Sequence, residues 1–397
     1  MIRISRKAFR LIEILPESYQ TPLNDAPKRK YSSMEKFALA CILLTCIIPC
    51  FGRQSTAPNE KQQQTPPAVQ KGGRISGLFY TDYFFKSGGD TVIGGGATQF
   101  SLPMVNGANG FLLRRLYVIY DHVFSEQFVG QVILETNDKS FEPGTRHGFF
   151  LKMAYVEWKN LLPRIDMSFG LIGTPTWAWG NAERLWGYRS VEKTIADFRS
   201  LGGATDFGIA FRGRLDADGA LSFYAGVGNG TGQKPDADKY KKYYGMFVLK
   251  LFDGFLLEAT GDYEPASGDR STTTMKGLAV YQIPELTLGC EFVRQSQKNV
   301  SPGVERIPSG VSFYATAPIS SVAGWKAFAR YDSYDPDVNL STGYRESFIT
   351  AGFDYAANEN VHFIPNFWLN AFSQEASTLA TKEADIAVRL TVAVTMR

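Results

Sequence analysis

From about residue 74 to its end, the chain is a series of short segments in which apolar and polar residues alternate at every second position. Alternation with a period of two is typical of β-strands that have one apolar and one polar face. Connections after even-numbered segments are short, and those after odd-numbered segments are longer. The sixteen predicted strands are residues 74–86, 111–123, 127–138, 148–159, 164–173, 203–214, 219–229, 241–252, 255–264, 273–283, 285–297, 308–317, 323–333, 345–357, 360–372 and 384–396.

The last segment has the clearest alternation. In residues 385–396, Ile, Val, Leu, Val, Val and Met alternate with Asp, Ala, Arg, Thr, Ala and Thr. In residues 241–252, Phe247, Leu249 and Leu251 oppose Lys242 and Lys250 in the same way. Charged residues therefore gather on one face of the strands. Alternation alone does not tell whether that face surrounds a water-filled interior or covers a soluble sandwich or barrel.

An export signal is predicted before the strands. Residues 34–52 combine a charged start, an apolar stretch of about twelve residues and small residues near Gly52, and this stretch is too short to span a bilayer. We expect residues 1–33 to be a start-site extension, residues 34–52 a cleaved secretory signal peptide, and residues 53–71 a flexible periplasmic lead-in. Lipid attachment at Cys46 or Cys50 is an alternative to cleavage after Gly52.

The leader accounts for the basic balance of the whole chain. It holds eight of the 42 Lys and Arg residues and four of the 39 acidic residues, so residues 53–397 have 34 basic and 35 acidic side chains. No nucleic-acid partner is implied by such a near-neutral chain. Three of the four cysteines also lie in the leader. Cys290 alone can form neither an intrachain disulfide nor a cysteine metal site, and no cofactor is predicted.

An export signal, an even number of amphipathic strands and unequal connections together predict an all-β protein. In lipid every backbone polar group needs a partner within the protein, which amphipathic strands achieve only in a closed barrel. We therefore expect residues 72–397 to form a sixteen-stranded antiparallel transmembrane β-barrel in the outer membrane, with short periplasmic turns and long external loops. The expected partners are membrane lipid, the barrel assembly machinery and small hydrophilic solutes.

Several phrases of the sequence resemble the Gram-negative outer-membrane porins, and most closely those of the phosphate-selective porin O and P type. The phrases are FLLRRLYVIY at 111–120 with FVGQVILE at 128–135, FARYD at 328–332, and ITAGFDY at 349–355 leading to IPN at 364–366. The resemblance covers about residues 72–397 and implies a passive pore, a homotrimer and a third external loop that folds inward. Such barrels usually end in an aromatic residue, whereas this chain ends in Met396 and Arg397.

The connection at 174–202 is that third external loop, and we expect it to narrow the bore. Its aromatic residues Trp177, Trp179, Trp186 and Tyr188 would anchor it against the barrel wall. An external cap over the mouth is the alternative. Fixed charges at a constriction set the electrostatic barrier for ions. The loop residues expected there are Glu183, Arg184, Arg189, Glu192, Lys193 and Arg199.

Charged residues are also expected on the lumen wall. A row of basic residues suits anions such as phosphate, but nearby acids can pair with them, so only a slight anion preference is predicted. The wall residues are Arg212, Arg214, Lys242, Lys250, Glu258, Asp262, Lys326, Arg330, Asp332 and Arg389.

Catalysis is not expected from this sequence. His122, His147 and His362 fall on separate segments, and the sequence has neither a Gly-x-Ser-x-Gly elbow nor a His-Glu-x-x-His pair. An outer-membrane barrel enzyme is nevertheless one alternative to a pore, and a structural or adhesive barrel with a plugged bore is another. Conductance would separate a pore from a plug, and turnover would reveal an enzyme.

Overall fold

A computed structural model describes residues 71–89, 106–138, 140–142, 146–176, 180–340 and 343–397 of the protein. The chain divides into two units, residues 1–66 and 67–397, of which the first lies outside the described residues. The predicted start-site extension, the signal peptide and residues 53–70 of the lead-in also lie outside the described residues. None of the described helices is long and apolar enough to cross a bilayer.

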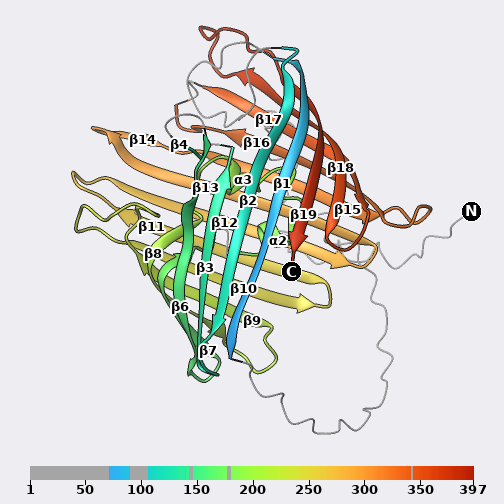
Figure 1. The fold of residues 1–397 in the computed structure, drawn as a ribbon. Helices are drawn as coiled ribbons and strands as arrows, with labels where there is room; N and C mark the ends of the chain where they lie inside the picture. Colours follow the sequence, from blue (N-terminus) through green and yellow to red (C-terminus); the bar gives the residue numbers. More distant parts are fainter. Residues whose placement is uncertain (1–70, 90–105, 139, 143–145, 177–179, 341–342) are drawn as a thin grey trace, which may run out of the picture. The chain divides into compact units, whose positions relative to one another are not determined.

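Sixteen long antiparallel strands form the wall of the second unit (Figure 1). They confirm all sixteen predicted strands, and the largest difference in a boundary, four residues, is at the end of β13. The strands are β1 (Gly72–Gly88), β2 (Asn109–Val123), β3 (Phe128–Asn137), β6 (Phe150–Leu162), β7 (Ile165–Gly173), β8 (Thr205–Arg214), β9 (Leu221–Gly228), β10 (Lys242–Phe252), β11 (Phe255–Pro265), β12 (Ser271–Ile283), β13 (Leu286–Ser301), β15 (Ser309–Pro318), β16 (Trp325–Asp335), β17 (Tyr344–Ala356), β18 (Val361–Gln374) and β19 (Asp385–Met396).

The sheet closes on itself. Each long strand pairs with the next, and β1 pairs with β19 over a register that runs from Gly77 opposite Met396 to Gly88 opposite Ile386. The backbone groups of the strands thus find partners within the sheet, as a barrel in lipid requires. Three short strands lie in the connections: β4 (Phe141–Glu142) pairs with β5 (Arg146–His147), and β14 (Val304–Arg306) extends the β13 hairpin.

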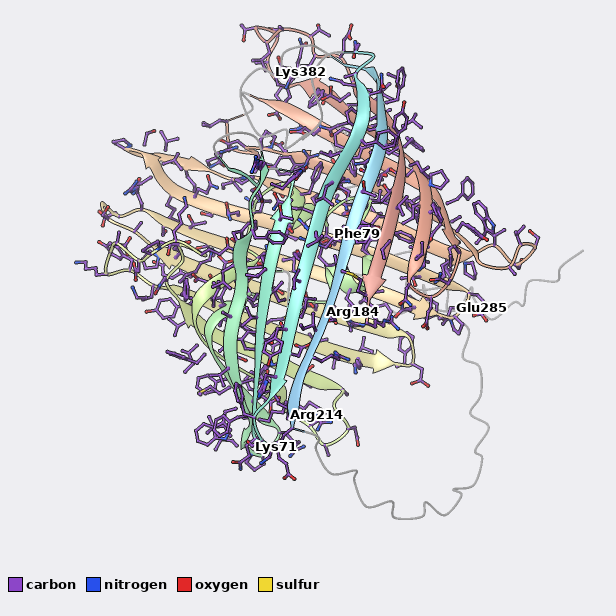
Figure 2. All side chains as sticks on the ribbon, viewed as in Figure 1. Lys71, Phe79, Arg184, Arg214, Glu285 and Lys382 are labelled. Carbon is purple, nitrogen blue, oxygen red and sulfur yellow. The ribbon has the colours of Figure 1, made fainter. Side chains whose placement is uncertain are left out.

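The connections differ at the two ends of the barrel. Turns after even-numbered long strands run from two residues, at 163–164, to six, at 215–220, whereas the longest connection on the other side is 174–204. The two-residue turn at 253–254 is tight because Gly254 has a φ of 83°, a left-handed conformation that glycine adopts without strain. Figure 2 labels Arg214, next to a short turn, and Lys382, in a long connection, at opposite ends.

The two faces of the wall differ in polarity. Outward-facing Phe169 and Phe353 are 60% and 51% exposed, whereas inward-facing Glu346 and Asp354 are 3% and 6% exposed. A soluble barrel has the opposite arrangement, with a dry apolar interior. An apolar outer face around a polar inner face is the arrangement of a transmembrane β-barrel.

The connection at 174–204 folds into the barrel, and the external cap is therefore wrong. It contains the short helices α2 (Ala182–Trp186) and α3 (Ile195–Phe198), which Figure 1 shows within the ring of strands. Trp186 and Tyr188 pack on Tyr314 and Phe328 of the wall. Other apolar residues of the loop continue this core against β13 and β16–β19. Trp177 and Trp179 lie outside the described residues.

Candidate functional site

The inward loop is held together by its own charged residues. Helix α2 ends at Trp186, and the next residue, Gly187, has a φ of 75° that lets the chain turn back so that α3 comes close to α2. Arg189 then bridges Glu183 of α2 (2.6 Å) and Asp197 of α3 (2.9 Å). Glu183 also accepts a hydrogen bond from the Thr194 backbone N–H at 2.9 Å. Burial alone would lower the pKa of Arg189, but the two carboxylates raise it well above its usual value.

Four side-chain contacts anchor the loop to the wall formed by β17 and β18. Arg199 lies 2.5 Å from Glu346 in a buried ion pair and donates a hydrogen bond to Asn370 at 3.3 Å. The Tyr188 hydroxyl donates to Asp354 at 3.2 Å. The indole N–H of Trp368 donates to Glu192 at 3.1 Å.

Backbone groups of the loop bind the wall as well. The Val191 carbonyl accepts hydrogen bonds from Arg114 (2.7 Å) and Arg389 (3.2 Å). The Leu201 carbonyl accepts one from Gln295 at 2.9 Å. Further contacts join Asn181 to Glu258 on β11 and Lys193 to Arg330 on β16. The loop is therefore attached to β2 and to much of the wall between β11 and β19.

A small cavity of about 80 Å³ lies between the loop and the wall formed by β1–β3. The acids that line it are Asp138 and Glu192, and the other lining residues include Tyr80, Arg114, Arg115, Arg189, Ser190 and Lys193. Each basic residue there has an acidic partner; Arg115, for example, lies 3.1 Å from Glu135. Burial would raise the pKa of Glu192, but Arg114 and Arg389 hold it below its usual value.

Larger spaces lie on the side of the loop that faces the short turns. They have volumes of about 630, 450 and 380 Å³, and Arg184 lines all three. Tyr80 and Ser190 line both the 630 Å³ space and the small cavity across the loop, so the two adjoin between β1 and the loop. We call this place the junction. Arg212, Arg214 and Lys250 line the 380 Å³ cavity, and Lys326 lines the 630 Å³ space.

The structure places most of the other predicted wall charges in ion pairs. Lys242 lies 3.3 Å from Asp262, and Glu258 lies 3.0 Å from Lys276. The remaining pairs are Arg330 with Asp332, Arg389 with Asp82, and Arg212 with Glu157. Sequence reasoning missed most of the residues that hold the loop, namely Arg114, Gln295, Glu346, Trp368 and Asn370. Apart from Arg114, which lies at a β-bulge, their only signal is a polar or aromatic residue at an inward position of a strand.

The barrel has the fold of solved outer-membrane porins and channels. No family model and no curated protein matches this chain. An anion-selective porin from Comamonas acidovorans is 13% identical, with a TM-score of 0.57 over 82% of this chain and all of that one. The outer-membrane channel DcaP of Acinetobacter baumannii is 9% identical, with a TM-score of 0.61 over 83% and 99%. OmpF of Salmonella typhi, solved with daunomycin, is 12% identical, with a TM-score of 0.56 over 81% and 98%. At these identities the likeness is one of fold, and the O and P type stays a prediction.

Proposed function

We propose that this protein is an outer-membrane porin through which small hydrophilic solutes and ions diffuse passively. The observation that carries the proposal is the inward loop, which is fixed across the bore of a closed barrel while water-accessible cavities remain on both sides of it. Solutes would pass the loop at the junction, between Tyr80 and Ser190. No catalytic role is proposed.

The proposed pore has a slight preference for anions. Bases and acids are paired around the junction, which gives a transverse field more than a selective row of positive charge. On the turn side of the loop, however, Arg184, Arg214, Lys250 and Lys326 make no ion pair with any residue that the structure describes. They leave an excess of positive potential in the bore. Phosphate itself is not singled out by this arrangement.

We further propose a homotrimer that is exported with a cleaved signal peptide and inserted by the barrel assembly machinery. The support is the shared porin fold together with the apolar segment at 34–52. Trimers would migrate as a separate species on gels run without heating and would fall apart on boiling. The mature N-terminus, read from protein isolated from membranes, would locate the cleavage site.

Conductance in a planar bilayer tests the pore. Stable current steps support it, and a potassium chloride gradient gives the preferred ion from the reversal potential. We expect Arg184→Ala and Arg189→Ala to shift the reversal potential toward cation preference. The first variant removes an unpaired base, and the second removes the positive charge that pairs with Glu183 and Asp197. Arg270→Ala is the control, because Arg270 lies in an external loop and, among the described residues, its side chain hydrogen-bonds to Ser267 of the same loop.

One result would contradict the pore, and another would contradict only the assignment of its ion path. A barrel that shows heat-modifiable migration but carries no current would be plugged, and a structural or enzymatic role would then be favoured. An unchanged reversal potential in both variants would remove Arg184 and Arg189 from the ion path while leaving the pore itself intact.

A further inference from the structure

Charge is distributed unevenly among the three spaces on the turn side of the loop. In the 450 Å³ space, Arg184 and Lys250 are balanced by Asp218 and Asp253. In the 630 Å³ space, Lys326 and Arg184 face Asp354, which His362 contacts at 2.8 Å. The 380 Å³ cavity is different, because it has one acidic residue, Asp166, among five basic ones. These are Arg164, Arg184, Arg212, Arg214 and Lys250.

Most of the basic residues of this cavity are available to a ligand. Arg212 is held by Glu157, but Arg164, Arg214 and Lys250 form no ion pair with any residue in the described ranges. Asp166 accepts a hydrogen bond from the Asn160 backbone N–H at 2.8 Å and so is partly used within its own turn. Exposed cations converge here from the turn at 163–164, from β8 and from β10, and α2 adds Arg184.

Apolar residues line the same cavity beside the basic ones, since Leu256 pairs with Lys250 and Tyr224 pairs with Arg212 in the sheet. Tyr224, Met246 and Val248 are buried members of one cluster on β9 and β10, and Leu256 of β11 packs against them. The Tyr224 hydroxyl donates to the Gly173 carbonyl at 3.1 Å, so its polar end already has a partner. A cavity lined by cationic side chains and by neighbouring apolar ones matches a molecule with a charged end and a carbon body.

We propose that this cavity binds a small organic dianion, a phosphate ester or dicarboxylate whose oxygens bind Arg214, Lys250 and Arg184 and whose carbon body lies against Val248 and Leu256. Guanidinium groups suit these oxygens because their planar donors can bind two at once. The volume of about 380 Å³ lies within the range of about 300–1,000 Å³ usual for small-molecule pockets. The proposal rests on the proposed function, since the ligand is a solute of the bore.

Direct binding is the first test. Phenyl phosphate and inorganic phosphate are titrated calorimetrically into the detergent-purified protein at about pH 8, above the second pKa of a phosphate ester near 6. We expect phenyl phosphate to bind more tightly. Arg214→Ala and Lys250→Ala should each weaken it about tenfold or more, because each removes a charged partner of the phosphate. Leu256→Ser should reduce the advantage of phenyl over inorganic phosphate. Lys326→Ala is the matched control, an exposed and unpaired base of the bore that lines a different space.

Single-channel recording is the second test, with phenyl phosphate added to one side at a time. We expect brief blocks at lower concentration from the side of the short turns, because the loop separates the cavity from the other side. A conducting pore without measurable phenyl phosphate binding would overturn this site and leave the porin standing. Equal losses in Lys326→Ala and Arg214→Ala would also overturn it, since a diffuse field would then explain the binding. Binding that Arg214→Ala weakens, in a barrel that never conducts, would support the site and overturn the pore.

Discussion

The ion pair between Arg199 and Glu346 is the contact on which the position of the inward loop should depend most. Both side chains are buried, with 1% and 4% of their surfaces exposed. The guanidinium also lies 4.4 Å from the ring of Phe198 and 4.9 Å from that of Tyr334. Arg199→Ala would leave the Glu346 carboxylate buried with the amide of Asn370, 2.7 Å away, as its remaining partner.

The cost of Arg199→Ala follows from this burial. Removing one partner of a buried ion pair destabilises a protein by about 3–5 kcal/mol, because the other charge stays in a poorly hydrated place. If about 3 kcal/mol falls on the attachment of the loop, the detached state becomes roughly 100-fold more populated. Arg74 is the control: its side chain is 74% exposed, its partner Asp121 is 33% exposed and keeps a hydrogen bond from Gln131, and its loss should cost about 0–1 kcal/mol.

Open-channel current noise and the temperature of unfolding on gels measure these two effects. We expect Arg199→Ala to be noisier and less heat-stable than both the wild type and Arg74→Ala. Arg199→Met combined with Glu346→Gln should recover part of the stability, since neither charge is then left alone. If Arg199→Ala behaves like Arg74→Ala in both assays, the buried pair does not hold the loop. If the double variant recovers nothing, lost packing explains the cost.

Three further outcomes follow from the contacts. Trp186→Ala should lower the free energy of unfolding by about 3–5 kcal/mol in thermal denaturation, because Trp186 is fully buried against the rings of Tyr314 and Phe328. Gly170→Ala should reduce the folded yield, because Gly170 has a φ of 129° and a Cβ there would lie 2.4 Å from the Ala154 carbonyl oxygen. Gly277→Ala, where a Cβ meets nothing within 4 Å, should not. Current noise should rise as the pH falls below about 4. The pKa of Glu192 is lowered in the folded protein, so its ionised carboxylate stabilises the loop above about pH 4, and this stabilisation is lost as the carboxylate is protonated at lower pH. A rise in noise already at neutral pH would contradict this.

The strands could be predicted from the sequence because their signal is local. One face of each strand meets lipid and the other meets water or polar groups, so the two-residue period is written into every segment. Residues 385–396 illustrate this, since Val388 and Leu390 are exposed on the outside while Ala387 and Arg389 are buried on the inside. The inward course of the loop at 174–204 could be predicted from its position after the fifth long strand and from the resemblance to porins.

A strict period of two could not reveal where the wall departs from it. Tyr80 pairs with Arg115, but the next residue, Thr81, pairs with Leu113, so Arg114 is the extra residue of a β-bulge. Because of this bulge two consecutive arginines turn inward: Arg115 binds Glu135 on the wall, and Arg114 binds the carbonyl of Val191 on the loop. Alternation would have placed one of them in lipid.

The partners of the loop charges depend on distances that the sequence does not contain. Arg199 was expected near the constriction, but its position within the loop does not reveal Glu346, which lies 147 residues further along the chain. The register of β17 and the packing of α3 against Phe348 bring the two together. Arg184, by contrast, has no described acidic partner and faces three spaces of the bore. Residue type alone could not separate an anchoring charge from one open to solutes.

The division between charges that anchor the loop and charges open to solutes affects the ion selectivity of the proposed pore. At the junction, Arg114 lies near Asp82 and Glu192, and Arg189 lies between two acids, so their positive charge is largely cancelled. Unpaired bases lie instead on the turn side, away from the place where solutes would pass the loop. Positive potential there would gather anions near the periplasmic mouth without a strong barrier to cations at the junction. A slight anion preference together with a binding site on one side of the loop is the combination that this distribution of charge favours.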